Sequence, residues 1–444
     1  MPGERLSNVE LKVLVHSVFI GITVGFAIVI YLKLTHFFMH IFFFGDPFKT
    51  IKKIPFYILI FPPIVGAIIV SFLKITNENI KEYGVVRVAR ILEEGKLIIG
   101  IKDVILKIFA SAISIGSGFA VGNEGPSAEV GAILAFYLSK LVKIPVTLMR
   151  TVIAAGASAG IAAVFISPFT GFVFGLELIV KELSLTNSFI MVLSAVFGFA
   201  IASHFFHGDI FPFIFQRTIS FQDILYSVFM VPLVVIASLI FLRVKDSINL
   251  QIFYPIEKKV EKIMKKYGIS GKYKIFVRAI LAGFFTACLL KLTPYAGFSG
   301  HILIEKLIYE NQEFAFRLAL LILLARILST SLALGWGAVG GLFMPILSIG
   351  ALLGYLYALV LKDFLPDIYL PNSYFAAIGA AAFLGSILNV PTTAIVLSFE
   401  LTLNFSVIVP AAVVTIFSMH FLLFYRELYS KYLEKKYKNR YKND

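Results

Sequence analysis

The feature that most constrains this chain is a succession of apolar segments long enough to cross a lipid bilayer. The hydrocarbon core of a bilayer is about 30 Å thick and needs about 20 mainly apolar residues per spanning helix. Of the 444 residues, 59% are hydrophobic and 15% are charged, whereas soluble domains carry about 25% charged residues. The sequence therefore predicts an all-α polytopic membrane protein. The apolar runs begin near Leu11, Pro55, Val104, Ser127, Phe189, Phe221, Ile275, Phe314, Gly340, Tyr374 and Val407.

Charged residues are distributed unevenly along the chain. The formal net charge of +14 would suit a nucleic-acid-binding protein, but the basic residues gather in segment 243–274 and in the tail after Phe424, whereas loop 207–222 is almost uncharged. An excess of Lys and Arg marks the cytoplasmic loops of membrane proteins. We therefore predict a multi-pass protein of the plasma or inner membrane, with a cytoplasmic C-terminus and no nucleic-acid partner. The basic loop also suits contact with anionic membrane lipid.

The sequence lacks the usual patterns of metal and cofactor sites. Its single cysteine, Cys288, excludes a disulfide within the chain and argues against a Cys-based metal site. The seven histidines show no ligand spacing such as HExxH. No paired aspartates or Ser/His set stand in the apolar segments, which argues against an intramembrane enzyme. We predict no metal, no cofactor and no enzymatic activity.

An internal repeat relates two distant parts of the chain. Residues 156–178 match residues 379–401 without a gap. Each copy has a helix rich in small residues, a break at a proline, and a second apolar helix that is too short to cross the membrane alone. The matched positions include Gly156 with Gly379, Pro168 with Pro391, and Glu177 with Glu400.

A second and more approximate pair joins residues 122–134 with residues 340–354. Both segments have a glycine-rich turn, a proline near the first helical turn, and an apolar helix. Small residues allow close helix packing in membranes, which explains part of the pattern. Broken helices at matching positions of two halves, however, indicate a binding site near the membrane midplane. Four breaks in two matched pairs favour a site.

The helix starts that follow these breaks predict the charge of the ligand. Free N–H groups and the positive end of the helix dipole attract anions. Several such starts near the midplane would bind an anion without a lysine or arginine, and weakly enough to release it. The sequence therefore favours an anion pathway.

Glu124 is a carboxylate at the start of the helix that begins near Pro126. In its ionised form it could occupy the anion site, and in its protonated form it could leave. It would then be both gate and proton carrier, because an ionisable residue at membrane depth is functional by default. The alternative is a static charge that balances the helix dipole.

The ordered set of motifs resembles the CLC family of chloride channels and chloride/proton antiporters. The stretch GNEGP at 122–126 resembles the Gly-(Arg/Lys)-Glu-Gly-Pro element of that family, and GGLFMP at 340–345 resembles its Gly-x-Phe-x-Pro element. The two proline breaks of the repeat resemble its dimer-facing helix breaks, and ELYSKYL carries the tyrosine of its last helix, Tyr429. The resemblance covers residues 11–432.

The resemblance implies a fold and an assembly. We expect a CLC-type inverted repeat with many tilted and broken transmembrane helices, in one transport domain over residues 1–432. Its halves would span about 11–205 and 221–432, with a basic cytoplasmic loop at 243–274 and a short basic tail at 433–444. The family architecture further implies a homodimer with one pathway in each subunit.

The resemblance also implies roles for individual residues. Glu124 would be the gating and proton-carrying glutamate. The implied anion ligands are the backbone N–H groups of Leu342 and Phe343, the hydroxyl of Tyr429, and Tyr83 and Gly84 in the first anion loop.

Several positions depart from the family pattern. Tyr83 stands where the family has a serine, and Asn123 replaces the basic residue beside the gate, which puts the identity of the anion in doubt. Leu178 replaces a second, cytoplasm-facing glutamate found in many antiporters of the family, which favours a channel. Glu177 and Glu400 are equivalent in the repeat, so we expect both to bond the backbone of the broken helices. A proton relay through Glu177 is the alternative.

The sequence thus predicts transmembrane transport of small inorganic anions, with chloride favoured, as a chloride/proton antiporter or a chloride channel. A fluoride/proton antiporter of the CLC type is the alternative, because fluoride-exporting relatives also lose the serine. A cation or organic-solute transporter that uses Glu124 as a ligand is more remote, since the apolar segments offer few further acidic groups.

Overall fold

The computed structural model of the chain describes residues 8–80, 100–206, 220–366 and 368–440. Secondary structure in these ranges is helical, and their one extended pairing is an antiparallel bridge between Gly122 and Gly341. The prediction of an all-α protein is confirmed.

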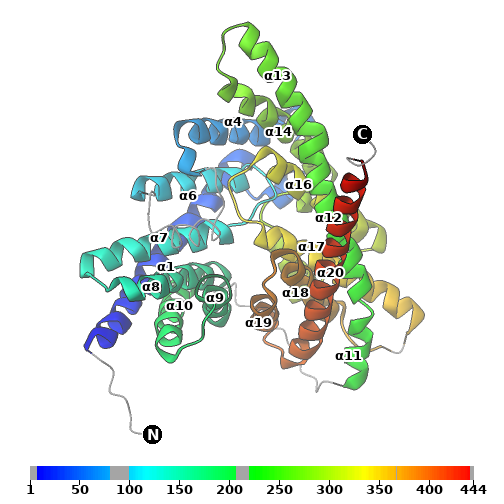
Figure 1. Cartoon of the computed structure of the whole chain (residues 1–444). Helices are drawn as coiled ribbons and strands as arrows, with labels where there is room; N and C mark the ends of the chain where they lie inside the picture. The colour runs from blue at the N-terminus through cyan, green and yellow to red at the C-terminus, as the bar shows by residue number, and fades with distance from the viewer. Residues whose placement is uncertain (1–7, 81–99, 207–219, 367, 441–444) are drawn as a thin grey trace.

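Two groups of helices stand side by side, one in blue to green and the other in green to red (Figure 1). The first group contains α1 (Asn8–Phe43), α2 (Pro47–Thr50), α3 (Phe56–Leu59), α4 (Phe61–Thr76), α6 (Ile101–Gly116), α7 (Glu124–Val142), α8 (Val146–Phe165), α9 (Pro168–Gly175) and α10 (Leu185–Phe205). The second contains α11 (Phe221–Val228), α12 (Val231–Ser247), α13 (Tyr254–Lys266), α14 (Lys274–Leu292), α15 (His301–Ile304), α16 (Phe316–Trp336), α17 (Phe343–Phe364), α18 (Asn372–Leu388), α19 (Pro391–Thr402) and α20 (Ile408–Arg440).

Nine helical segments of the described residues are long and apolar enough to cross a membrane. The apolar runs expected near Val104, Ser127 and Tyr374 form α6, α7 and α18, which are not among the nine. Helix α18 has 17 residues. Helix α6 has 16 residues, and charged residues interrupt the apolar run of α7. Large apolar side chains also cover the outside of the spanning helices, as at Phe19, Ile30 and Phe37 on α1. A surface of this kind suits lipid, and the protein is a multi-pass membrane protein.

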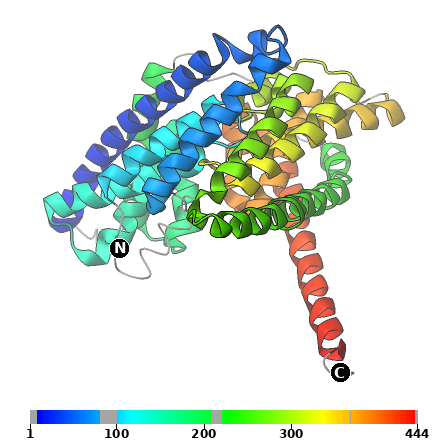
Figure 2. The same ribbon diagram turned by 90° about the horizontal axis from the view of Figure 1, so that it is seen from above.

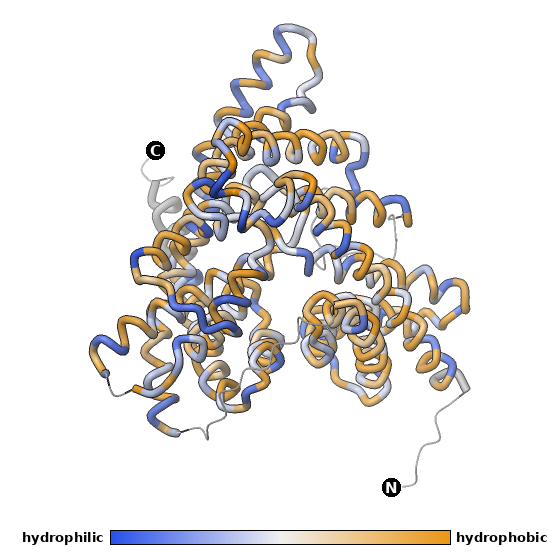
Figure 3. The backbone as a smooth tube through the Cα atoms, turned by 180° about the vertical axis from the view of Figure 1, so that it is seen from behind, coloured by the Kyte–Doolittle hydropathy of each residue, from blue (hydrophilic) through white to orange (hydrophobic). Residues whose placement is uncertain are grey.

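Hydrophilic residues gather at the margins of the molecule (Figure 3). Helix α13 projects from the body and has no buried residue (Figure 1). Helix α20 is continuous, and its C-terminal part extends away from the other helices (Figure 2). The polar, basic segments thus lie outside the packed apolar body.

The repeated glycines let the first helix of each repeat copy approach the helix before it. A Cβ atom on Gly156 of α8 would lie 2.2 Å from the carbonyl oxygen of Gly131 on α7. At the matched position, a Cβ on Gly379 of α18 would lie 2.4 Å from the carbonyl oxygen of Gly350 on α17. Any larger residue would separate these backbones, so small-residue packing accounts for these glycines.

Candidate functional site

The predicted breaks occur at matching points of the two repeats. Helix α8 ends at Phe165 and α9 begins at Pro168, and α18 ends at Leu388 while α19 begins at Pro391. Both prolines stand in the first turn, where the missing N–H costs no hydrogen bond. A residue with left-handed backbone conformation lies at each break, Ile166 in the first copy and Asn389 in the second. Helices α9 and α19 pack against each other where the two groups meet (Figure 1).

Glu177 and Glu400 join these broken helices reciprocally. The carboxylate of Glu177 accepts hydrogen bonds from the N–H groups of Thr392 and Thr393, both at 2.9 Å, at the start of α19. The carboxylate of Glu400 accepts from the N–H groups of Phe169 at 2.9 Å and Thr170 at 2.6 Å, at the start of α9. Each threonine hydroxyl adds a further bond. The structural role predicted for this pair is confirmed.

The second pair of breaks brings the starts of α7 and α17 together. The N–H of Gly122 donates to the carbonyl of Gly341 at 2.7 Å, and the N–H of Gly341 donates to the carbonyl of Gly122 at 2.5 Å. These two hydrogen bonds hold the two glycine-rich turns against each other. Two helix N-termini, each the positive end of a dipole, therefore meet at one point inside the protein.

Glu124 occupies this meeting point. It is the first residue of α7 and is 3% exposed. Its Oε2 atom accepts a hydrogen bond at 3.3 Å from the N–H of Met344, in the first turn of α17. The side chain thus reaches from its own helix to the start of the other one. The absence of a side chain at Gly122 makes room, because a Cβ there would lie 2.1 Å from Oε2.

A cavity of about 250 Å³ leads to Glu124. Asn123, Glu124 and Met344 line one part of it, and His36 and His301 line others. Its walls come from α1, from the end of α8, and from the segment that runs from residue 298 into α15. An ion that entered this cavity would meet the carboxylate and then the start of α17.

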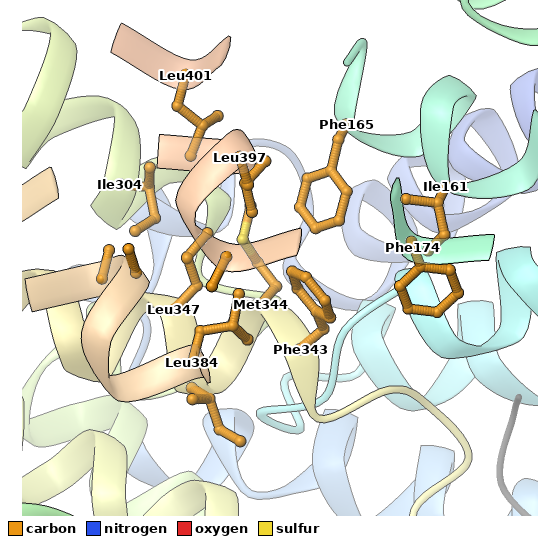
Figure 4. Packing of buried hydrophobic residues seen from close by; sticks show 14 of the residues in the cluster. Ile161, Phe165, Phe174, Ile304, Phe343, Met344, Leu347, Leu384, Leu397 and Leu401 are labelled. Atoms are coloured by element: carbon orange, nitrogen blue, oxygen red, sulfur yellow. The ribbon is translucent and has the colours of Figure 1, made fainter. Parts of the chain in front are cut away.

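The start of α17 is apolar around its backbone. Leu342 and Phe343 are the residues from which the helix begins. The ring of Phe343 lies 5.0 Å from that of Phe165 and 6.3 Å from that of Phe174, between centroids (Figure 4). Among these side chains, the polar groups available to a ligand are the backbone N–H groups of the first turn. They have the character of the anion site that the sequence predicts.

Arg326 contacts the loop that lines the cavity, and the sequence interpretation missed it. This side chain of α16 is fully buried. Its guanidinium donates to the Ser348 hydroxyl at 3.0 Å, to the Tyr295 carbonyl at 3.4 Å, and to the carbonyls of Gly297 and Ser299. It thus holds the loop that lines the cavity. A lone arginine within the apolar run 318–336 was the available signal.

Of the remaining predicted residues, the structure describes Tyr429. Tyr429 is 44% exposed on α20 and stacks on Tyr425 with a centroid distance of 6.4 Å. Tyr83 and Gly84 lie outside the described residues. The anion-ligand roles of these three residues stay predictions from the resemblance.

Broken helices in matched pairs around a buried carboxylate define a membrane transport protein. Residues 65–422 match the family model described as voltage gated chloride channel. The match covers most of the sequence, and the chain belongs to the voltage-gated chloride channel (CLC) family.

Relatives and solved structures agree with this assignment. The chain is 27% identical over 341 residues to an H+/Cl− exchange transporter ClcA of Vibrio cholerae, covering 75% of this chain and 70% of the relative. A ClcA of Vibrio parahaemolyticus is 26% identical over 340 residues, with the same coverage. The fold matches a slow cyanobacterial Cl−/H+ antiporter with a TM-score of 0.77, 19% identity, and coverage of 94% and 95%. It matches a CLC-type fluoride/proton antiporter with a TM-score of 0.69, 21% identity, and coverage of 94% and 96%. The predicted CLC fold is confirmed.

Proposed function

We propose that the protein exchanges chloride for protons across a membrane. The observation that carries the proposal is the position of the Glu124 carboxylate on the N–H of Met344, at the start of α17. A carboxylate is an anion, so an N–H group that binds the carboxylate can also bind chloride. The exchange transporters among the relatives support chloride as the anion and protons as the coupled ion.

In this proposal, the carboxylate and chloride compete for the same helix start. The ionised Glu124 side chain occupies the N–H groups and blocks the pathway. Protonation removes its negative charge, so its attraction to the helix dipole falls and chloride takes its place. When the acid loses its proton, the carboxylate returns and displaces the chloride. One proton is therefore bound and released in each cycle of anion movement.

The anion site in this proposal uses the backbone at Leu342, Phe343 and Met344. Tyr83, Gly84 and Tyr429 complete it, which requires the last part of α20 to approach the pathway in the transporting assembly. The protein works as a homodimer with one pathway per subunit, in the plasma or inner membrane, with the basic loop 243–274 and the C-terminus in the cytoplasm. Its activity is transport without covalent chemistry.

Transport by the purified protein in liposomes tests the proposal. An outward chloride gradient should drive protons into the vesicles against their own gradient, at a fixed ratio of chloride to protons. Chloride movement that never drives protons uphill would instead define a channel.

Fluoride forms the second arm of the same measurement. The fluoride/proton antiporter of similar fold and the tyrosine at position 83 are the reasons to include it. Proton uptake driven by fluoride and not by chloride would show that fluoride is the transported anion. Cation movement with neither anion would overturn the proposal entirely.

A further inference from the structure

A line of buried polar side chains runs along α6 and plays no part in the site described above. Asp103, Lys107, Ser111 and Ser114 are spaced by four, four and three residues, so they share one face of the helix. Lys107, Ser111 and Ser114 are buried, and Asp103 is partly buried near the helix start. Burial of polar and charged side chains in an apolar protein costs free energy, and ionisable residues at membrane depth usually have a function.

Lys107 forms a salt bridge with Glu129 of α7 in the middle of this line. The side chains are 4% and 1% exposed. A buried ion pair contributes little to stability, because desolvation of two charges offsets their attraction, and well-packed apolar substitutes are often tolerated. Stability alone therefore does not explain this buried pair. Glu129 is also five residues beyond Glu124 on α7, which is about 7.5 Å along the helix axis.

Contacts between α1 and α7 show on which side of Glu124 the pair lies. The Nζ atom of Lys12 donates to the Val142 carbonyl at 2.9 Å, at the end of α7. Val24, further along α1, packs at Gly131. Thr35, further still, lines the cavity that leads to Glu124. The two helices are thus antiparallel, and Glu129 lies between Glu124 and the end of α7 that is remote from the cavity.

A hydroxyl pair lies between the two carboxylates. Ser111 is one turn beyond Lys107 on α6, and its hydroxyl is 2.5 Å from that of Tyr31 on α1. Both residues are fully buried. On α1, Tyr31 lies between Val24, which packs at Gly131, and Thr35, which lines the cavity together with Glu124. The order along the molecule is therefore the Lys107–Glu129 pair, then the Ser111–Tyr31 pair, then Glu124.

We propose that Glu129 is a second proton-binding site, held by Lys107, which exchanges protons with Glu124 through the Ser111 and Tyr31 hydroxyls. A proton from water adds to the Glu129 carboxylate and gives a neutral acid. The acid passes its proton into the line of hydroxyls and bridging water, and the Glu124 carboxylate takes a proton at the other end. Glu129 then returns to the ionised form beside Lys107. Each step breaks one O–H bond and forms another.

This site would serve the face of the membrane opposite the cavity. The inference rests on the proposed exchange of chloride for protons.

The test measures the ratio of protons to chloride transported in liposomes. The double variant Lys107→Met/Glu129→Gln removes both charges together, so neither is left facing a lost partner. We expect chloride transport to continue while coupled proton transport falls about 100-fold, the size of effect typical for loss of a positioned proton-transfer group. Glu129→Asp, which keeps the carboxylate, is the matched control and should retain measurable coupling of protons to chloride.

Tyr31→Phe gives a second test that leaves both charges in place and removes one hydroxyl. It should lower the proton-to-chloride ratio, a readout that a purely structural role would not change. A wild-type ratio in either the double variant or Tyr31→Phe would overturn this proposal while the proposed function stands. Absence of coupled protons in the wild-type protein would overturn the proposed function itself, and this inference with it.

Discussion

Glu124 concentrates the transport chemistry in one side chain. It starts its own helix and accepts a hydrogen bond from the start of another. The amide of Glu124→Gln cannot gain or lose a proton between pH 4 and 9, so proton transport should fall to background. Chloride transport should continue and lose its dependence on pH over that range. Paired recordings of chloride efflux and external pH check both expectations.

Glu182→Gln is the matched control, because Glu182 is an exposed carboxylate in the loop between α9 and α10. It should transport as the wild-type protein does. Coupled proton transport that survived in Glu124→Gln would show that another group carries the proton.

Gly122 is the residue that makes room for the gate. A methyl group there would lie 2.1 Å from Oε2 of Glu124, closer than any nonbonded contact allows. Gly122→Ala should therefore displace the carboxylate from the Met344 N–H, and chloride efflux at neutral pH should rise. Gly100→Ala is the control, because a Cβ at Gly100 would have no neighbour among the described residues closer than 3.9 Å. An unchanged pH dependence of efflux in Gly122→Ala would argue that the carboxylate does not block the pathway.

At the scale of elements, the broken helices depend on Glu177 and Glu400. Each carboxylate bonds two N–H groups and a hydroxyl across the contact between α9 and α19. A glutamine has one acceptor oxygen, and its NH2 group would face a donor. Glu177→Gln and Glu400→Gln should each lower the free energy of unfolding by about 2 kcal/mol, since hydrogen bonds to a charged group contribute about 1.5–3 kcal/mol.

A thermal unfolding series in detergent measures this loss, with Glu182→Gln again as control. The two variants should be similarly destabilised because the repeat makes their surroundings equivalent. A loss confined to one variant would mean that the two carboxylates have different roles.

The sequence predicted these elements well where the repeat was visible. The match of Pro168 with Pro391 gave both breaks, and the equivalence of Glu177 and Glu400 indicated a shared structural role. Arg326 was not found, because a single arginine in an apolar run gives no sign of which carbonyls it will meet. Those partners, Gly297 and Ser299, are about 30 residues away and reach it only through the tertiary fold.

At the scale of the whole molecule, the two repeats each supply half of the site. Helix α7 of the first repeat brings the carboxylate, and α17 of the second brings the N–H groups. The length of the apolar runs predicted a multi-pass helical protein, and the matched breaks predicted a binding site near the membrane midplane. The position of Tyr429 could not be predicted in the same way, because it depends on the path of α20. That helix is continuous, and its C-terminal part extends away from the other helices (Figure 2).

The most direct test is whether an anion binds where the Glu124 carboxylate lies. A crystal structure of Glu124→Ala grown in bromide, with anomalous diffraction to locate the ion, answers this question. Bromide should lie within hydrogen-bonding distance of the Met344 N–H, at the start of α17, and should be weaker or absent there in the wild-type protein at neutral pH. Bromide found only elsewhere, with that N–H left to water, would contradict the shared site.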